Sequence, residues 1–358
     1  MRSCLLTLGL VAGIAFHAAA QSPKETALAK GQEAIKLMDE GHVPESIKLL
    51  EEAATLDPAN YHYSYELALA HYMLKEYPAA IALLTPLVDR KETSERTFQL
   101  LGNSYDLAGQ GPKAVEIYTQ GLAKFPGSGP LHLEMGNLQL AKKNYVEALS
   151  FYEKGIEMAP TFPSNYYRAA KLYLASNNEL WGMIYGELFM NLERNSARTA
   201  EMSKLLFDTY KSEITFPKPN SASVSFGQTV IDASTMGKGK NLKLPYSLAY
   251  ETTMGVAVAS EHEITLRSLN TIRNSFISTY YAMKHDAKYP NVLFDYQRQI
   301  DKAGHAEAYN YWLLMKGDED GFDAWAKANP EKWKNFVAWY QNNSLALDAK
   351  HKFYRTQY

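Results

Sequence analysis

Hydrophobic residues recur at helical spacing over most of the chain, and the spacing itself repeats along the sequence. Three prolines 34 residues apart each open a segment whose apolar positions follow the period of a helix: Pro44, Pro78 and Pro112. A second series keeps the same period, with one interval skipped at Glu92: Pro58, Pro126 and Pro160. Fixed spacing of this length is typical of an array of structural repeats.

Each repeat is predicted to contain two amphipathic helices joined by a tight turn. In the third unit, four residues on one face mark the first helix: Phe98, Leu101, Gly102 and Tyr105. After the turn at 109–111, the second helix and the end of the unit are marked by Pro112, Ala114, Tyr118, Gly121 and Pro126. The fourth unit repeats this order, with Gln139 replacing the tyrosine: His132, Met135, Gly136, Ala148, Tyr152, Gly155 and Pro160. Small residues such as Gly136 let the two helices of a unit approach closely.

This pattern resembles the tetratricopeptide repeat, whose order of large, small and aromatic residues these units follow. The resemblance covers about residues 24–195, roughly half the chain, as five consecutive units. The second unit keeps the pattern at Leu67, Ala68, Ala80 and Leu84. The first departs from it at Glu33 and Ala34. The fifth shows Tyr166, Ala169, Ala170 and Tyr173, then a helix from 179 to 192 with Gly182 in place of alanine. Terminal units that drift in this way are expected of caps.

The resemblance implies an all-α, right-handed superhelix whose concave face is lined by the first helix of each unit. Such faces hold an extended peptide or a partner helix. Ten residues occupy the lining positions here: Tyr65, Leu69, Tyr72, Gln99, Asn103, Asp106, Leu133, Asn137, Tyr167 and Lys171. We therefore expect a protein or peptide partner at these residues.

Asn103 and Asn137 fall at the same position of successive units, where an amide both donates to and accepts from a peptide backbone. In one subset of the family, two such asparagines and basic residues hold a C-terminal carboxylate. Lys171 fits that role, but Gln99 and Tyr167 supply no charge where lysines would help, so the carboxylate site is incomplete. The simpler interpretation is that these residues are solvated polar groups on a groove wall.

The repeat register ends near Arg194. Residues from Ala197 to Ile214 are predicted to form a further helix that caps the array. The following residues, to 243, are rich in Pro, Ser, Gly and Lys and form an irregular linker. Within it, the alternating run from Val224 to Ile231 predicts one extended strand. A single strand cannot pair with itself, so it would lie along the helices or pair with another chain.

The last part of the chain is again helical by its periodicity, and it resembles no recognised family. Three helices are marked by apolar residues within 264–276, 293–300 and 308–314, and two short ones follow around Trp325 and Trp333. Four of the five tryptophans lie in this part, which predicts a packed core of its own. The predicted organisation is a signal peptide at 1–20, the repeat array at 21–195, a capping helix and linker at 196–243, and a C-terminal domain at 244–358.

The first twenty residues have the features of an export signal. Arg2 gives a positive start, an apolar run extends from Leu5 to Phe16, and three alanines precede Gln21. The run is too short for a stable membrane span, and a retained anchor is the alternative. Because Cys4 is the only cysteine, the mature chain would have no disulfide and no thiolate metal site. Export without disulfides fits a Gram-negative periplasm, and other exported locations stay open.

Composition and net charge limit the classes of partner that we expect. Hydrophobic residues make up 46% and charged residues 21%, as in a soluble globular protein. The formal net charge of −2 gives no reason to expect nucleic acid or an anionic membrane surface. Residues 21–196 carry 16 basic and 22 acidic side chains, whereas residues 197–358 carry 20 and 17. The opposite signs suggest that the two parts dock on each other or that each meets a complementary partner.

No motif identifies a reaction, so no catalytic residue, metal or cofactor is expected. The glycines at 109–111 lack the spacing of a phosphate loop and fit the turn between repeat helices. The acidic run from Asp318 to Asp323 lacks the ligand spacing of a calcium loop, and helix capping near Asp323 explains it more simply. Glu261 to Glu263 contains one histidine without a second four residues on, unlike a zinc protease motif.

Hypotheses of different classes follow. The first is a non-enzymatic interaction scaffold of the cell envelope that binds a peptide or protein segment in the concave groove. The alternative is that the C-terminal domain is an enzyme or ligand-binding module whose substrate the repeats recruit. It predicts a cleft that gathers polar side chains such as His262, His285 and Asp295, with shifted pKa values. A third hypothesis is homo-oligomerisation through residues 224–231.

Overall fold

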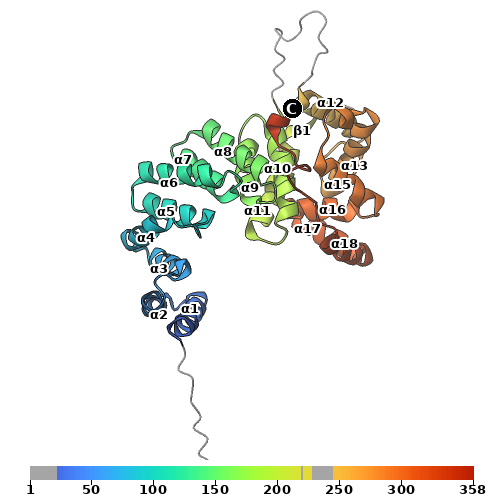
Figure 1. The fold of residues 1–358 in the computed structure, drawn as a ribbon. Coiled ribbons are helices and arrows are strands. Elements are labelled where there is room, and N and C mark those ends of the chain that lie inside the picture. Colours follow the sequence, from blue (N-terminus) through green and yellow to red (C-terminus); the bar gives the residue numbers. More distant parts are fainter. Residues whose placement is uncertain (1–21, 219–220, 228–244) are drawn as a thin grey trace, which may run out of the picture. The chain divides into compact units, whose positions relative to one another are not determined.

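The computed structural model describes residues 22–218, 221–227 and 245–358 (Figure 1). These residues form helices and one short pair of strands, so the predicted all-α class is confirmed. The predicted signal at 1–20 lies outside them. Within the described ranges, no helix combines the length and the apolar content that a membrane span requires. Contacts divide the chain into two compact units, Met1–Gln110 and Gly111–Tyr358.

The first unit is a run of helices that pack in sequence order. They are α1 (Pro23–Asp39), α2 (Val43–Leu56), α3 (Tyr61–Met73), α4 (Tyr77–Leu84), η1 (Thr85–Leu87) and α5 (Glu95–Leu107). Each helix contacts the next one, and α3 also contacts α1 and α5. The first helices of successive repeats therefore form one layer, as the repeat pattern predicts.

Residues at fixed repeat positions explain how the helix pairs begin and pack. Pro44 and Pro78 lie in the first turns of α2 and α4, where a missing N–H leaves no hydrogen bond unmade. In the second compact unit, Gly111–Tyr358, Gly136 of α7 (Gly129–Ala141) faces Tyr152 of α8 (Tyr145–Met158). A Cβ at position 136 would lie 2.3 Å from the tyrosine ring. Glycine is therefore required for this close approach.

The second unit continues the repeats and then adds the C-terminal helices. Its first elements are α6 (Gly111–Lys124), α7, α8, α9 (Pro163–Leu174), α10 (Glu179–Leu192), α11 (Ala197–Glu213), β1 (Ile214–Lys218) and β2 (Ser221–Val224). The remaining ones are α12 (Tyr246–Ala257), α13 (Leu266–Ala282), α14 (His285–Lys288), α15 (Val292–Lys302), α16 (Ala306–Leu314), η3 (Met315–Gly317), α17 (Glu319–Ala328), α18 (Pro330–Asn342) and η4 (Arg355–Gln357). The predicted helix at 179–192 and the helix from Ala197 are both confirmed.

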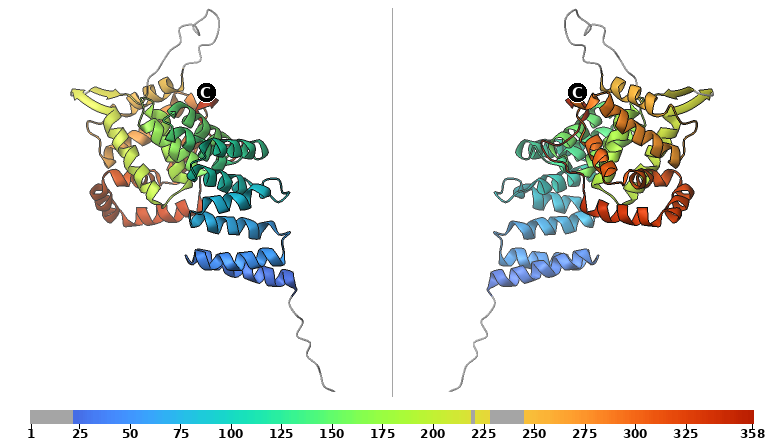
Figure 2. Two further views of the ribbon diagram at one scale, coloured as in Figure 1. Left: turned by 90° about the vertical axis from the view of Figure 1, so that its left-hand side faces the viewer. Right: turned by 90° about the vertical axis from the view of Figure 1, so that its right-hand side faces the viewer.

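The extended segment after α11 differs from its prediction. Strands β1 and β2 pair with each other antiparallel, with Ile214 opposite Val224 (Figure 2, drawn in yellow). Val224 therefore pairs within the chain, whereas the prediction placed it along the helices or against another chain. The β-branched Ile214, at the end of α11, starts the partner strand that the sequence analysis missed. Residues 225–227, which the prediction included, do not continue the strand, and residues 228–231 lie outside the described residues.

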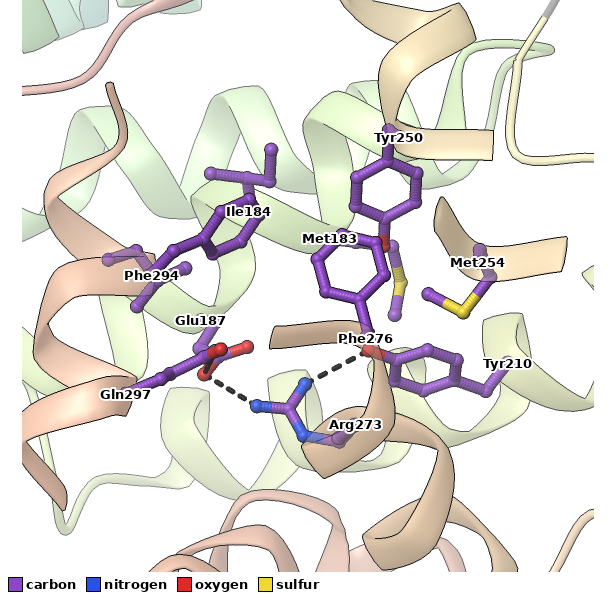
Figure 3. Close-up of a pocket in the computed structure, with 11 residues that line it drawn as sticks. Met183, Ile184, Glu187, Tyr210, Tyr250, Met254, Arg273, Phe276, Phe294 and Gln297 are labelled. Carbon is purple, nitrogen blue, oxygen red and sulfur yellow. Dashed lines mark hydrogen bonds and ion pairs between the residues drawn. The ribbon is translucent and has the colours of Figure 1, made fainter. Parts of the chain in front are cut away.

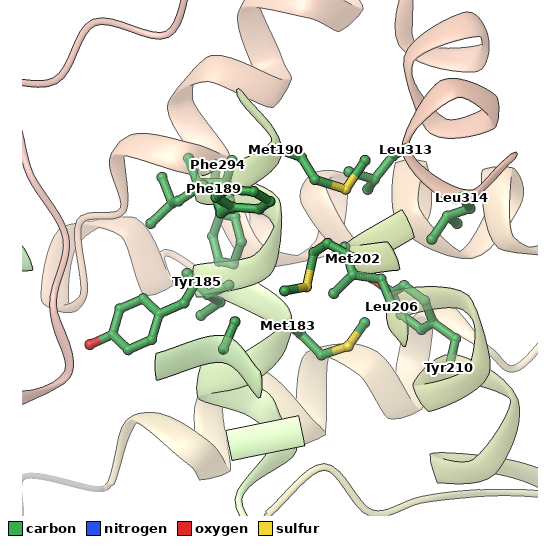
Figure 4. Packing of buried hydrophobic residues seen from close by; sticks show 14 of the residues in the cluster. Met183, Tyr185, Phe189, Met190, Met202, Leu206, Tyr210, Phe294, Leu313 and Leu314 are labelled. Atoms are coloured by element: carbon green, nitrogen blue, oxygen red, sulfur yellow. The ribbon is translucent and has the colours of Figure 1, made fainter. Parts of the chain in front are cut away.

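The core of the second unit surrounds α10, most of which is buried. A single cluster of buried residues runs from Ala148 to Phe353 and includes side chains of α10, α11 and the C-terminal helices. Figure 4 shows Met183 and Met190 of α10 near residues of α11 and α16, including Met202 and Leu313. The expectation that the C-terminal helices enclose a core of their own is therefore wrong. Because most residues of α10 are buried, they pack directly onto it.

The acidic run at 318–323 has the capping role that was expected, but at a different residue. Asp318 precedes α17, and its side chain accepts a hydrogen bond of 3.0 Å from the Gly321 N–H. The cap is therefore Asp318 and not Asp323, and Glu319 and Asp320 place negative charge at the helix N-terminus.

Candidate functional site

In the first unit, six of the ten predicted binding residues lie on two neighbouring helices. They occupy α3 and α5, which contact each other: Tyr65, Leu69, Tyr72, Gln99, Asn103 and Asp106. Asp106 is exposed and the other five are partly exposed. Tyr65, Leu69 and Tyr72 follow helical spacing on α3, as Gln99, Asn103 and Asp106 do on α5, and binding at these residues stays a prediction.

Aromatic side chains stiffen this face. The ring of Tyr65 stacks on that of Tyr61, with 6.1 Å between centroids and 15° between planes. Tyr61 is itself fixed, because it is buried and its hydroxyl hydrogen bonds to that of Thr97. Burial raises the pKa of Tyr65 to about 12. At the other end of α3, Tyr72 meets Tyr77 edge to face.

In the second unit, the predicted asparagine is already engaged within the fold. The Asn137 amide donates a hydrogen bond of 3.0 Å to Glu134 and accepts one of 3.0 Å from the Tyr152 hydroxyl. Leu133, one turn earlier on α7, is partly exposed. Binding of a peptide backbone by Asn137 would therefore compete with these two bonds.

The remaining two predicted residues are tied to helix α11. Tyr167 is buried, and its hydroxyl donates to Glu201, while Lys171 Nζ lies 2.6 Å from Glu201 Oε1. The hydrogen bond from Lys171 lowers the pKa of Glu201, and the same bond raises the pKa of Lys171. Glu201 of the capping helix α11 therefore already pairs with Lys171, the charge that a C-terminal carboxylate would need.

The polar residues named for the alternative function differ in exposure and in their partners. His262 is exposed, whereas His285 lies against the Tyr280 ring and burial lowers its pKa. Asp295 is exposed and accepts a hydrogen bond of 2.6 Å from the Tyr281 hydroxyl. None of these three side chains lines the buried cavity described below.

Comparison with known families identifies the family to which the repeats belong. Residues 32–94 and residues 107–172 each match a sequence model described as tetratricopeptide repeat. This part of the chain is a tetratricopeptide repeat array. The repeats support the function of a protein–protein interaction scaffold with protein or peptide partners. The C-terminal helices match no family model, and no curated protein matches the chain.

Several solved structures resemble the repeat-bearing chain. The pilF protein of Pseudomonas aeruginosa is 16% identical, with 54% of this chain and 86% of that one covered and a TM-score of 0.45. A tetratricopeptide repeat protein of Thermus thermophilus is 17% identical, with 50% and 98% covered and a TM-score of 0.42. The C-terminal part of a repeat-containing protein from Cytophaga hutchinsonii is 16% identical, with 87% and 96% covered and a TM-score of 0.42.

Beyond the tetratricopeptide repeats, the structure shows a buried polar cluster that sequence reasoning missed. Glu187 of α10 accepts hydrogen bonds from Arg273 of α13 at 2.7 Å and from the Tyr309 hydroxyl at 2.8 Å, and also from Gln297. Arg273 in turn donates to the Tyr210 hydroxyl at 2.9 Å (Figure 3). Both charged side chains of this pair are almost fully buried, since the exposed fractions of Arg273 and Glu187 are 7% and 5%.

Residues of this cluster line one side of a cavity of about 20 Å³, whose other lining residues are apolar and include Met183, Met254 and Phe276. A space of this size accommodates about one water molecule. The Glu187 Oε1 atom accepts all three hydrogen bonds, and the described residues contain no group of three His, Cys, Asp or Glu that could hold a metal ion. The cluster therefore joins helices, and this cavity has no room for a substrate. Arg273, Gln297 and Tyr309 also line a second cavity of about 100 Å³.

One signal in the sequence did mark this pair. Glu187 is the single charged residue in the apolar run from Leu180 to Leu192, and Arg273 stands between Ile272 and Phe276 on an apolar helix. Charged residues are rarely buried unless they are paired, so each predicts a buried partner. Their separation of 86 positions hides the pairing from any local pattern.

Proposed function

We propose that the protein is an exported scaffold that holds a peptide or protein segment against the face formed by α3 and α5. The observation that carries the proposal is the row of accessible aromatic, amide and acidic side chains on these two adjoining helices. Tyr65 and Tyr72 offer large contact areas at a small cost in side-chain entropy. Asn103 offers an amide that can donate to and accept from one peptide group of an extended segment.

The net negative charge of the first compact unit favours a basic partner. Residues 22–110 carry 14 acidic and 8 basic side chains, so the net charge of −6 counted for residues 21–196 falls within the first unit. Asp106 is exposed on the proposed face, and Glu66 of α3 is partly exposed there, with a pKa that burial raises. Acidic surfaces attract and orient basic segments. A C-terminal carboxylate fits less well, because Lys171 is neutralised by Glu201.

Export to the cell envelope is part of the proposal and rests on residues 1–20. Their positive start, apolar run and three alanines support cleavage before Gln21. Sequencing the N-terminus of the protein recovered from cells tests this part directly. A mature chain that begins near Gln21 is expected, and an intact Met1 on a cytoplasmic protein would contradict export.

The binding face is tested with a matched pair of charge reversals. Asp106→Lys changes an exposed acid on the proposed face, and Glu51→Lys makes the same change on α2, where Glu51 is also exposed. With purified full-length protein and envelope extract, we expect Asp106→Lys and Asn103→Arg to reduce partner capture at least tenfold. Glu51→Lys should capture as the wild type does. Equal capture by all of these variants would contradict binding at α3 and α5.

A further inference from the structure

The chain ends in a segment that packs like a bound peptide. After α18, residues from Asn343 onward run without a regular helix until the short η4 turn. Its main-chain hydrogen bonds from Asp348 to His351 and from Gln357 to Tyr354 are local. Leu345, Leu347 and Phe353 are nonetheless buried. Side chains, more than main-chain pairing, therefore hold this C-terminal tail, residues 343–358, against the second unit.

Arg355 is the polar anchor of the tail. Its guanidinium donates two hydrogen bonds to Glu153 of α8, from Nε at 2.8 Å and from Nη2 at 2.7 Å. The paired arrangement matches the planar fork of arginine to the two carboxylate oxygens. The Arg355 main-chain N–H also donates to the Tyr185 hydroxyl of α10 at 2.8 Å. Backbone and side chain of one residue are thus recognised together.

Phe353, two residues earlier, is the apolar anchor. It is fully buried, with its ring 5.7 Å from that of Tyr246 and 6.2 Å from that of Trp181. Tyr358 also stacks on Tyr246, with 5.5 Å between the two ring centroids. Beside the apolar anchor, Lys352 donates to the main-chain carbonyl of Glu157 at 2.7 Å. An aromatic residue and an arginine at spacing i, i+2 therefore define the contact.

The receptor side of this contact is organised without the tail. The Glu153 carboxylate also accepts hydrogen bonds from Tyr173 of α9 at 2.9 Å and from Tyr185 at 3.1 Å. These tyrosines would keep it oriented, and partly satisfied, if Arg355 left. Glu153 is 5% exposed, whereas the Arg355 side chain is 41% exposed and within reach of water. The Glu153 carboxylate therefore has two donors outside the tail besides the two from Arg355.

We propose that the C-terminal tail is a built-in peptide ligand of the last two repeats, and that a partner segment with an aromatic residue two positions before an arginine can displace it. The surface of Glu153, Tyr173, Tyr185, Trp181 and Tyr246 is then a second peptide site, separate from the face of α3 and α5. The tethered tail competes at an effective concentration on the order of millimolar, so the site is closed to weak ligands.

Peptide binding to the full-length chain tests the proposal. A labelled peptide of residues 343–358 is titrated into the wild type and into a full-length variant with Phe353→Ala and Arg355→Ala. We expect at least tenfold tighter binding to the variant, because its own tail no longer competes. A peptide with Arg355→Ala should bind the variant at least tenfold more weakly. The full-length variant Lys350→Ala, at an exposed tail position, is the control and should bind the labelled peptide as the wild type does. Equal binding to both chains, or no binding to either, would overturn the proposal.

Hydrogen exchange on the unaltered protein gives a second test that does not depend on a variant. Peptides covering 343–358 are compared with those covering α10 and with the free tail peptide. A detachable tail is expected to exchange at least tenfold faster than α10 and at least tenfold slower than the free peptide. Protection equal to that of α10 would show the tail to be an inseparable part of the core. Exchange equal to that of the free peptide would show that it does not dock.

Discussion

At the scale of single residues, the turn between the two helices of a repeat depends on one backbone conformation. Gly41, Lys75, Gly109 and Lys143 stand 34 residues apart, and all four have positive φ, between 63° and 86°. Glycine adopts this left-handed region freely, whereas a lysine there is strained. Four of the five turns therefore adopt this conformation, with glycine at two of them, whereas Asn177, at the same position of the fifth repeat, has no positive φ.

This strain predicts that Lys143→Gly stabilises the protein. Removing the left-handed penalty gains about 1–2 kcal/mol, and the added flexibility of the unfolded chain costs about 0.5–1 kcal/mol. We expect the free energy of unfolding to rise by about 0.5–1 kcal/mol, measured by urea denaturation. Lys142→Gly, at a neighbour with φ of −83°, is the control and should destabilise. A loss of stability in Lys143→Gly would show that this turn is not strained.

His132 predicts a pH dependence of stability. It is buried in the second unit, where desolvation lowers its pKa below the ordinary value of 6.5. Its Nε2 contacts the Pro126 carbonyl at 3.2 Å, while its Nδ1 is buried without a protein partner. Below pH 6.5 the unfolded chain therefore binds more protons at this site than the folded chain, and stability falls as pH decreases.

The variant His132→Phe is expected to lose less stability between pH 7 and pH 5 than the wild type. Phe98 occupies the same position of the preceding repeat, so the ring fits the fold. Burial also lowers the pKa values of His285 and His305, so part of the pH dependence should stay. Thermal unfolding at a series of pH values checks this. An unchanged slope would mean that His132 is protonated without cost in the folded state.

At the scale of elements, the Glu187–Arg273 pair links helices that are far apart in sequence. Arg273 of α13 bonds to Glu187 of α10 and Tyr210 of α11, and donates to Asn310 of α16 at 2.7 Å. Gln297 of α15 donates a hydrogen bond to the same carboxylate. The C-terminal helices are therefore fixed to the end of the repeat array by polar bonds as well as by the apolar core around α10.

Arg273→Met is predicted to be strongly destabilising, since it leaves Glu187 buried without its charged partner. Breaking one side of a buried ion pair costs about 3–5 kcal/mol. The double variant with Glu187→Met and Arg273→Met should cost less than Arg273→Met alone, because it removes both charges. Urea unfolding of the three proteins measures the difference. A double variant that is the least stable of the set would contradict this account.

The sequence predicted those elements whose signals are local. The helix from Glu179 and the helix from Ala197 could be placed because the spacing of their apolar residues marks them. The hairpin was missed because β1 has only five residues, one of them Pro217, and its partner follows across a short turn. The site was predicted only in part. Position in the repeat predicted a binding role for Asn137 that stays a prediction, and it could not show the hydrogen bond from Tyr152, which comes from the next helix.

At the scale of the whole molecule, the chain joins a tetratricopeptide repeat array to C-terminal helices that share one core with the last repeats. The first unit carries the accessible face and the net negative charge, whereas the second unit carries the polar cluster and the docked tail. The two proposed peptide sites therefore lie in different units and differ in chemistry. One is an open, acidic, tyrosine-rich face, and the other is a buried carboxylate covered by residues 343–358.

The most direct test of the central claim is photo-crosslinking from α3 in intact cells. A photoreactive phenylalanine replaces Tyr72 in the full-length protein, and the same residue replaces Lys48 on α2 as the control. We predict a discrete crosslinked partner at position 72 that is lost when Asn103→Arg is added, and no such partner at position 48. The same product from both positions, or one that persists with Asn103→Arg, would contradict recognition by the face of α3 and α5.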